Sequence, residues 1–195
     1  MPEQTRTAPT APGGLATFNT TPSDTALGAL LTCLRSPRWA ERIAAHRPYP
    51  DVDALLAASD EAAYDLTPAD LDEAFAGEPL PTLPEDTYSA AHTALSAAHA
   101  AYESRFGHVF VVCLDHVPPA EALDHLLAAI RSRLTNDPED ERVTAADELR
   151  QRARGRLLRL LSGDSLSGDS LRGAGNRANN HDGAAPGTQP ATPPH

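Results

Sequence analysis

Apolar side chains recur every three or four residues through most of this chain, which is the spacing of one buried helix face. Helix starts are recognised by a Ser, Thr or Asp directly before such a pattern, often with Pro as the first helical residue. The predicted helices begin near Asn19, Ser36, Asp51, Thr67, Tyr88, Pro118 and Glu139. The pattern therefore predicts a single-domain, all-α helical bundle of about six to eight helices between Phe18 and Leu161, without a sheet.

The residues from Ala101 to Cys113 depart from this rhythm. Gly107 follows a helix-like run, and glycine tolerates the backbone angles that end a helix. The next residues, Val109 to Cys113, form an apolar run with both aromatic and β-branched side chains. Such a run is either a strand-like core segment without chemistry, or an irregular buried segment whose free N–H and C=O groups hold a polar ligand.

Both ends of the chain have a composition that cannot support a packed core. Residues 1–16 are rich in Pro, Thr, Ala and Gly, and residues 163–195 are rich in Gly, Ser, Asn and Pro. We expect a disordered arm, a helical domain over residues 17–162 and a disordered tail. Within the domain, the three prolines between Gly77 and Thr87 predict a loop that separates two helices.

A formal net charge of −11 argues against a nucleic-acid partner, because an acidic protein repels phosphate backbones. No apolar stretch approaches the roughly 20 residues of a membrane span, and the N-terminal residues lack a signal pattern, so we expect no membrane partner and a cytoplasmic location. Cys33 and Cys113 lie inside separate apolar runs. This placement favours buried free thiols over a disulfide or a zinc site.

One predicted helix, from Tyr88 to Tyr102, carries a polar stripe at a spacing of three and four residues. The stripe consists of Ser89, His92, Ser96, His99 and Glu103. It is either an ordinary solvated face or one wall of a pocket. His92 and His99 lie about 10 Å apart along the helix axis, so they cannot share one metal ion directly, and we predict no metal site.

The last predicted helix is crowded with arginines. They are Arg150, Arg152, Arg154, Arg156 and Arg159. Because residues two positions apart on a helix are rotated by about 200°, these side chains cannot all face one way. We expect most of them to be solvated or paired with nearby acids, with one turned inward.

Seven short motifs occur in order along the chain: Phe18-Asn19, Ser36-x-Arg38-Trp39-Ala40, Arg47-Pro48-Tyr49, Asp70-Leu71-x-Glu73-Ala74, Tyr102-Glu103-x-x-Phe106-Gly107-x-x-Phe110-Val111-Val112, Arg133-Leu134-x-Asn136-Asp137 and Arg156-Leu157. From about Phe18 to Leu161, this order resembles the family of 2-oxo-4-hydroxy-4-carboxy-5-ureidoimidazoline (OHCU) decarboxylases. Each motif is weak by itself, but seven in the right order make a coincidence improbable.

The resemblance implies an all-helical fold and a cofactor-free decarboxylation of OHCU to (S)-allantoin in urate degradation. In the family, an HPRIG motif supplies an acid/base His, and an SxxEQ motif supplies a Glu. Here HPRIG is replaced by Glu78-Pro79-Leu80-Pro81-Thr82, and SxxEQ is best matched by Ser89-Ala90-Ala91-His92-Thr93. The expected catalytic His is therefore Glu78, and the expected catalytic Glu is His92.

The resemblance also implies which residues bind the substrate. They are Ser89, Arg156 and the backbone-binding stretch Val111, Val112, Cys113, Leu114 and Asp115. An Arg, an acid/base pair and backbone donors can hold a carboxylate, stabilise the carbanion that decarboxylation leaves and return a proton. The expected partner is a small anionic ureidoimidazoline-type substrate, and a homodimer is compatible with the resemblance.

Three functions are compatible with these residues. In the first, Glu78 and His92 have exchanged positions and still face one another across a pocket floored by Val111 to Asp115. Arg156 then turns towards the pocket while the other arginines of its helix stay outside. In the second, the site has lost this activity, and the chain is a silent or differently specific small-molecule-binding relative. The third is a helical scaffold that is recruited through its tails.

Overall fold

The computed structural model describes residues 14–80 and 89–163 of the 195. Within these ranges the chain forms eight α-helices, one short 3₁₀ helix and no strand. The elements are α1 (Gly14–Thr20), α2 (Ser23–Cys33), α3 (Pro37–Ala45), α4 (Val52–Tyr64), α5 (Pro68–Ala76), α6 (Ser89–Phe106), η1 (Pro119–Glu121), α7 (Ala122–Arg133) and α8 (Pro138–Ser162). The all-α fold predicted from the apolar spacing is confirmed.

Most helix ends follow the local signals in the sequence. The side chains of Ser36 and Asp51 cap α3 and α4, and Thr67 and Asp70 form a reciprocal capping box at the start of α5. Each cap satisfies backbone N–H groups that have no partner within the helix. Gly107, with φ of +75°, ends α6 at the predicted break.

The N-terminal region differs from the prediction. In place of the one helix predicted to begin near Asn19, the chain forms α1 and α2, because Pro22 has no N–H to donate and disfavours the helical conformation in the residue before it. Helix α1 begins at Gly14, inside the segment 1–16 that composition predicts to be disordered. It is held there by packing of Leu15 and Phe18 on the core. The remainder of both predicted tails, and residues 81–88 of the predicted loop, lie outside the described ranges.

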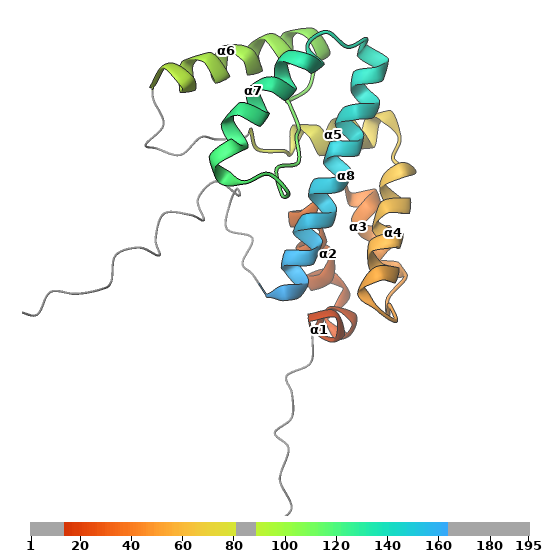
Figure 1. The fold of residues 1–195 in the computed structure, drawn as a ribbon. Coiled ribbons are helices and arrows are strands. Elements are labelled where there is room, and N and C mark those ends of the chain that lie inside the picture. Colours follow the sequence, from red (N-terminus) through yellow and green to blue (C-terminus); the bar gives the residue numbers. More distant parts are fainter. Residues whose placement is uncertain (1–13, 81–88, 164–195) are drawn as a thin grey trace, which may run out of the picture.

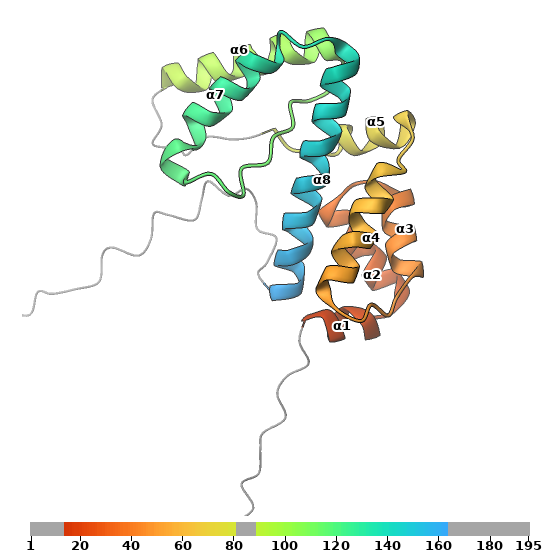
Figure 2. The same cartoon turned by 45° about the vertical axis from the view of Figure 1, so that its right-hand side comes forward.

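The helices are arranged along α8, a 25-residue helix that runs through the whole domain (Figures 1 and 2). Helices α1, α2 and α4 pack against α8, and α3 lies between α2 and α4. Helices α6 and α7 pack against each other near the N-terminal end of α8 (Figure 1). Two bodies of helices are therefore joined by one long helix.

Each body has its own hydrophobic core. The first core contains buried residues of α1 to α5 and α8, and the second contains Leu95, Tyr102, Phe110, Val112, Leu126 and Ile130. The segment after Gly107 separates them: Val109 and Val111 pack in the first core, whereas Phe110 and Val112 pack in the second. Successive side chains of an extended chain point to opposite sides, so this alternation shows that the segment is extended, although it forms no strand in the described ranges.

A buried ion pair connects the two bodies. Arg133 at the end of α7 donates to Glu141 of α8 from Nε at 2.8 Å and from Nη2 at 2.5 Å, and the two side chains are 8% and 0% exposed. Arg133 also donates to the carbonyl of Val111 at 2.6 Å, and Glu141 accepts from the amide of Asn136 at 2.9 Å. The hydroxyl of Tyr102 donates to Glu141 as well, and burial together with this bond raises the pKa of Tyr102.

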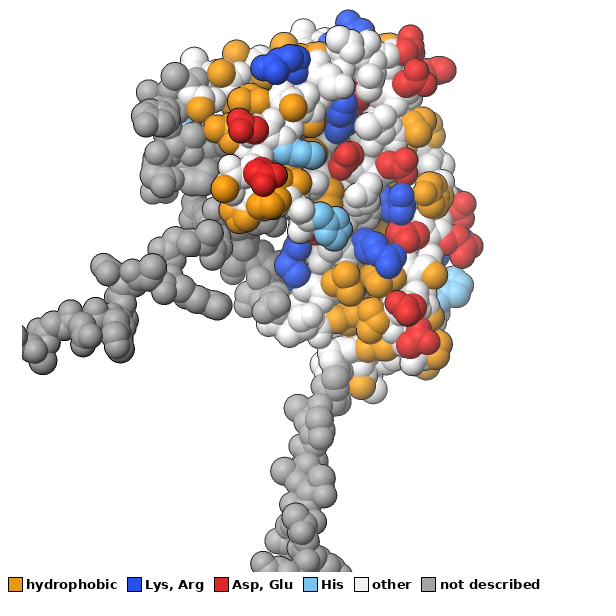
Figure 3. Space-filling model, in the orientation of Figure 1, with side chains coloured by type: hydrophobic (Ala, Val, Ile, Leu, Met, Phe, Trp, Pro, Cys, Tyr) orange, Lys and Arg blue, Asp and Glu red, His pale blue; other side chains and the backbone are white. Residues whose placement is uncertain are grey.

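The other ion pairs between helices are more exposed. Arg42 contacts Glu61 at 2.8 Å, and Arg142 contacts Asp72 at 2.5 Å. Acidic and basic side chains accordingly intermingle on the face shown in Figure 3. Exposed pairs of this kind contribute little stability each. In the part of the chain that the structure describes, no helix has the length and apolarity to cross a membrane.

Removing one partner of the buried pair should destabilise the fold strongly. We expect Arg133→Met to lower the free energy of unfolding by about 3–5 kcal/mol, because it leaves the Glu141 charge buried without its cation. Arg142→Met, which removes an exposed pair with Asp72, is the control and should cost less than about 1 kcal/mol. Urea unfolding measures both. Similar losses in the two variants would contradict the role given to Arg133.

The polar stripe of α6 is not a solvated face at His99. His99 is 6% exposed, and its ring stacks on Phe110 with 6.1 Å between the ring centroids. Among the described residues, Nε2 of His99 has no hydrogen-bond partner. Burial lowers the pKa of His99, and the opposing charge of Glu103 is a smaller effect. The imidazole is therefore neutral at neutral pH, because charging it inside the core would be costly.

Acid should destabilise the fold through His99. Its pKa is near 6.5 in the unfolded chain and lower in the folded one, so the unfolded state binds more protons below pH 6.5. Stability is then lost as the pH falls from 6.5 through the lowered pKa, by up to about 1.4 kcal/mol per pH unit. Urea unfolding of His99→Phe at neutral and acidic pH should show a smaller loss than the unsubstituted protein. Identical pH dependence in both would rule out His99 as the source.

Candidate active site

Glu78 lies at the centre of a cluster of charged side chains. It belongs to the coil that follows α5, and its side chain is only 2% exposed. Both of its carboxylate oxygens accept from Arg156 of α8, Oε1 from Nη1 at 2.6 Å and Oε2 from Nη2 at 2.8 Å. A bidentate pair of this kind is among the strongest geometries that a guanidinium and a carboxylate can form.

Arg152 makes a second ion pair with the same carboxylate, with 3.2 Å between its Nε and Oε2 of Glu78. The expectation that Arg156 alone would turn inward is therefore wrong. Arg152 precedes Arg156 by four residues, so the two share one face of α8. The remaining arginines of the helix pair with other carboxylates: Arg142 with Asp72, Arg150 and Arg154 with Asp60, and Arg159 with Asp115.

Arg156 is also tied to the end of α2, because its Nη1 donates to the carbonyl of Cys33 at 3.0 Å. Burial by itself lowers the pKa of Arg156, but the hydrogen bonds and charge of Glu78 outweigh it and raise the pKa. The guanidinium is thus both charged and held in place. Cys33 is the buried free thiol that the sequence predicts, and burial raises its pKa to about 11.

The predicted substrate-binding stretch 111–115 runs beside this cluster, and side chains of α8 hold its backbone. The carbonyl of Val112 accepts from Nη1 of Arg152 at 3.3 Å. The N–H of Cys113 donates to Oε2 of Glu148 at 2.7 Å. Because the stretch has no neighbouring strand in the described ranges, side chains satisfy polar groups that a sheet would otherwise pair.

Asp115 ends this stretch against the middle of α8. Its Oδ1 lies 3.2 Å from Nη1 of Arg159, and a Cβ added to Gly155 would lie 1.8 Å from its Oδ2. A glycine inside a helix costs about 1 kcal/mol relative to alanine, but here only glycine leaves room for the carboxylate. Leu114, just before it, is half-buried and packs against the second core. The end of the stretch is therefore anchored on two sides.

His92 lies half-buried near the start of α6. Ser89 is the first residue of that helix, and its side chain lies outside the described part of the structure, as do the residues that link α6 to the coil of Glu78. That Glu78 and His92 face one another therefore stays a prediction. Glu78 is engaged by two guanidinium groups, which the sequence motifs do not predict.

The sequence of this chain matches a known protein family. The family model described as OHCU decarboxylase matches residues 19–81 and 82–158. The chain belongs to the OHCU decarboxylase family. The family predicted from the motifs is confirmed.

Two solved structures share the fold of this family member. An (S)-allantoin synthase superposes with a TM-score of 0.64 at 19% identity, over 77% of this chain and 54% of that one. An OHCU decarboxylase in the presence of (S)-allantoin gives a TM-score of 0.60 at 20% identity, over 73% of this chain and 99% of that one. The chain therefore spans about half the length of the allantoin synthase. A search of curated proteins finds no match.

Residues of several family motifs form hydrogen bonds that hold the fold together, away from the candidate site. Tyr102, Arg133 and Asn136 all bond Glu141 in the buried network between the two bodies. Asn19 exchanges two hydrogen bonds of 2.9 Å with the backbone of Tyr49, which ties α1 to the turn after α3. These motif residues therefore stabilise the fold.

The motifs do not include Arg152 and Glu148, although Arg152 contacts Glu78 and Val112 and Glu148 contacts Cys113. The available signal is spacing, because Glu148, Arg152 and Arg156 follow one another at intervals of four residues and form one row along α8. Such a row predicts neighbours on a helix surface. It does not predict which element the row faces, and only the packing of α8 decides that.

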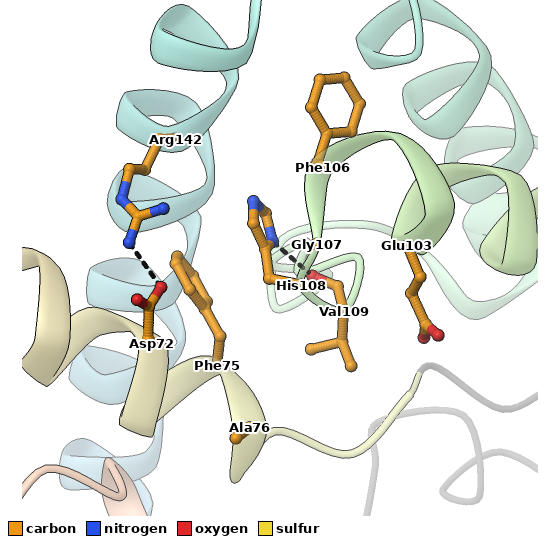
Figure 4. A pocket seen from close by; sticks show the side chains of 9 residues that line it. All are labelled: Asp72, Phe75, Ala76, Glu103, Phe106, Gly107, His108, Val109 and Arg142. Carbon is orange, nitrogen blue, oxygen red and sulfur yellow. Dashed lines mark hydrogen bonds and ion pairs between the residues drawn. The ribbon is translucent and has the colours of Figure 1, made fainter.

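A separate cleft of about 590 Å³ opens between α5, the end of α6 and the start of α8 (Figure 4). Asp72 and Arg142 form an ion pair at its edge, and the ring of His108 stacks on Phe75 with 4.5 Å between centroids. None of the predicted site residues lines this cleft. Within the described residues, no group of His, Cys, Asp or Glu is arranged to hold a metal ion, there or elsewhere.

Two glycine substitutions should have opposite effects on stability. Gly28 lies inside α2 with open space around its Cβ position, so Gly28→Ala should stabilise the fold by roughly 0.5–1 kcal/mol. Gly155→Ala should destabilise it, because the new methyl group meets the carboxylate of Asp115. Urea unfolding midpoints measure both changes. Stabilisation by both substitutions would show that Asp115 is not held against α8.

Proposed function

We propose that this chain decarboxylates OHCU to (S)-allantoin without a cofactor. The observation that carries the proposal is the buried carboxylate of Glu78 between Arg156 and Arg152, beside the backbone of residues 111–115. The family resemblance expects an acid/base residue, an arginine and backbone groups of this stretch at the substrate. Membership of the family supports the broader class, a decarboxylase of purine degradation.

The guanidinium groups of the cluster can attract an anionic substrate. Arg152 and Arg156 share the carboxylate of Glu78, while Asp115 pairs with Arg159. A carboxylate that enters the site is attracted by these guanidinium groups, and the low dielectric of a buried site strengthens the attraction. Since Glu78 already occupies both Nη groups of Arg156, the substrate must displace part of this pairing or bind on the side of Arg152.

The reaction needs charge stabilisation and one directed proton transfer. The bond between the ring carbon and the carboxylate breaks, CO₂ leaves, and the electron pair stays on the ring as a carbanion or enolate. Guanidinium and backbone N–H groups close to that charge lower its energy. A proton must then reach one face of the ring, and in this proposal His92 donates it with Glu78 as its carboxylate partner.

The alternative is a silent or differently specific small-molecule-binding relative on the same fold. One observation favours it: Glu78 fills the fork of Arg156, which is where an arginine would otherwise receive a carboxylate substrate. In such a relative, the ion pair would serve as a structural link between the coil after α5 and α8. Homodimer formation and a cytoplasmic location stay predictions from the sequence.

Freshly generated OHCU distinguishes the two functions. The protein is mixed with OHCU made by enzymatic oxidation of urate, and circular dichroism follows the chirality of the allantoin that forms. Uncatalysed protonation has no facial preference, so only catalysis yields an excess of the (S) form. Formation of (S)-allantoin above the uncatalysed rate supports the decarboxylase. Racemic product at the uncatalysed rate, with OHCU bound, supports the silent relative.

Substitution of the two arginines should have unequal effects on substrate binding. Arg156→Lys should raise KM by roughly tenfold or more, because lysine cannot reproduce the two parallel bonds that Arg156 forms with Glu78 or with a substrate carboxylate that displaces it. Arg152→Lys should raise it less, since the 3.2 Å from Nε of Arg152 to Glu78 is longer than either bond from Arg156 to the same carboxylate. Arg154→Lys, at a residue that pairs with Asp60, is the control and should leave KM unchanged. Equal effects at 152 and 156 would mean that Arg156 is not the main anion contact.

The exchange of the family's His and Glu can be tested by reversing it. Glu78→Ala and His92→Ala should each abolish turnover, whereas Glu78→His combined with His92→Glu should retain some of it, because the pair of groups is restored. The measurement is kcat for OHCU. Full activity in either alanine variant would contradict the exchange, and so would an experimental structure with the two side chains more than about 10 Å apart.

A further inference from the structure

The peptide group between Val112 and Cys113 is held from both sides by α8. The N–H of Cys113 donates to Glu148 at 2.7 Å, and the carbonyl of Val112 accepts from Arg152 at 3.3 Å. In a trans peptide the C=O and N–H point in opposite directions, so one bond on each edge fixes the orientation of the plane. Glu148 and Arg152 are one helical turn apart, and their opposite charges match the donor and the acceptor that they hold.

The next peptide group along the chain, between Cys113 and Leu114, is open as far as the described residues show. Neither the carbonyl of Cys113 nor the N–H of Leu114 forms a hydrogen bond with a described residue. Beyond it, the carbonyl of Leu114 accepts from Val117 at 3.0 Å. Because peptide groups are rigid and share their Cα atoms, the clamp on the preceding group limits the directions in which this open group can point.

The clamp is also joined to the charged cluster. Arg152 contacts Val112 through Nη1 and Glu78 through Nε, and Glu78 in turn pairs with Arg156. The orientation of one backbone peptide and the position of the Glu78 carboxylate therefore depend on the same guanidinium group. Glu148 completes this arrangement, because without it the Cys113 N–H has no partner to resist rotation of the peptide plane.

We propose that Glu148 is a positioning residue for the decarboxylation, an inference that rests on the proposed function. Glu148 acts through the Cys113 amide, and it directs the open Cys113–Leu114 peptide towards the substrate. The N–H of Leu114 can then stabilise the negative charge that remains after CO₂ leaves. Neither the family motifs nor the sequence pattern assigns a role to this glutamate.

Three variants of the full chain test this inference with OHCU as the substrate. Glu148→Ala removes the acceptor, Glu148→Gln keeps an oxygen acceptor, and Asp147→Ala is the matched control, since Asp147 pairs with Arg150 at 3.3 Å. We expect Glu148→Ala to lower kcat on the order of a hundredfold, with KM within about threefold and a reduced excess of (S)-allantoin. Glu148→Gln and Asp147→Ala should stay within about threefold of the unsubstituted enzyme.

Unchanged kcat and product chirality in Glu148→Ala would overturn the positioning role. A Glu148→Gln variant as impaired as Glu148→Ala would overturn it too, because the carboxylate itself would then be required. If Glu148→Ala does not fold, Glu148→Asp carries the same expectation, since its shorter side chain cannot reach the amide. Lack of OHCU turnover by the unsubstituted chain overturns the proposed function, whereas an active chain that is insensitive at Glu148 overturns only this inference.

Discussion

The buried ion pair of Arg133 and Glu141 is the contact on which the arrangement of both cores depends. It joins α7 to α8, and Arg133 reaches from there to the carbonyl of Val111 in the segment that separates the cores. A buried charge without its partner is costly, so these three elements are held in one relative arrangement. The candidate site depends on the same contact, because the segment that contains Val111 continues directly into Cys113 and Asp115.

Helix α8 carries an apolar row and a polar row side by side. Leu149, Ala153 and Leu157 are buried in the first core, and each directly follows one residue of the polar row Glu148, Arg152 and Arg156. Burial of the apolar row against α2 and α4 sets the rotation of the helix about its axis. With this rotation, the polar row contacts Glu78 and the backbone of Val112 and Cys113.

The motifs imply that Glu78 stands where the family has its catalytic His, and the two side chains differ in what they can bind. A carboxylate accepts two charge-assisted bonds from one guanidinium, which a neutral imidazole cannot do. Glu78 therefore pairs with both Arg152 and Arg156, and these ion pairs tie the coil after α5 to α8. In a decarboxylase this pairing sets the charge that the substrate meets. In a silent relative it occupies the place of the substrate carboxylate.

The sequence by itself determined the helical class, the capped starts at Ser36, Asp51 and Thr67, and the break at Gly107, because these depend on local spacing and local backbone chemistry. The ordered motifs identified the family and placed Glu78 and Arg156 in one site. Only the tertiary structure decided that Arg152 shares the carboxylate of Glu78, that Glu148 holds Cys113 and that His99 is buried. These facts depend on which face of a helix meets another element, and the apolar pattern of one segment does not contain that information about its neighbour.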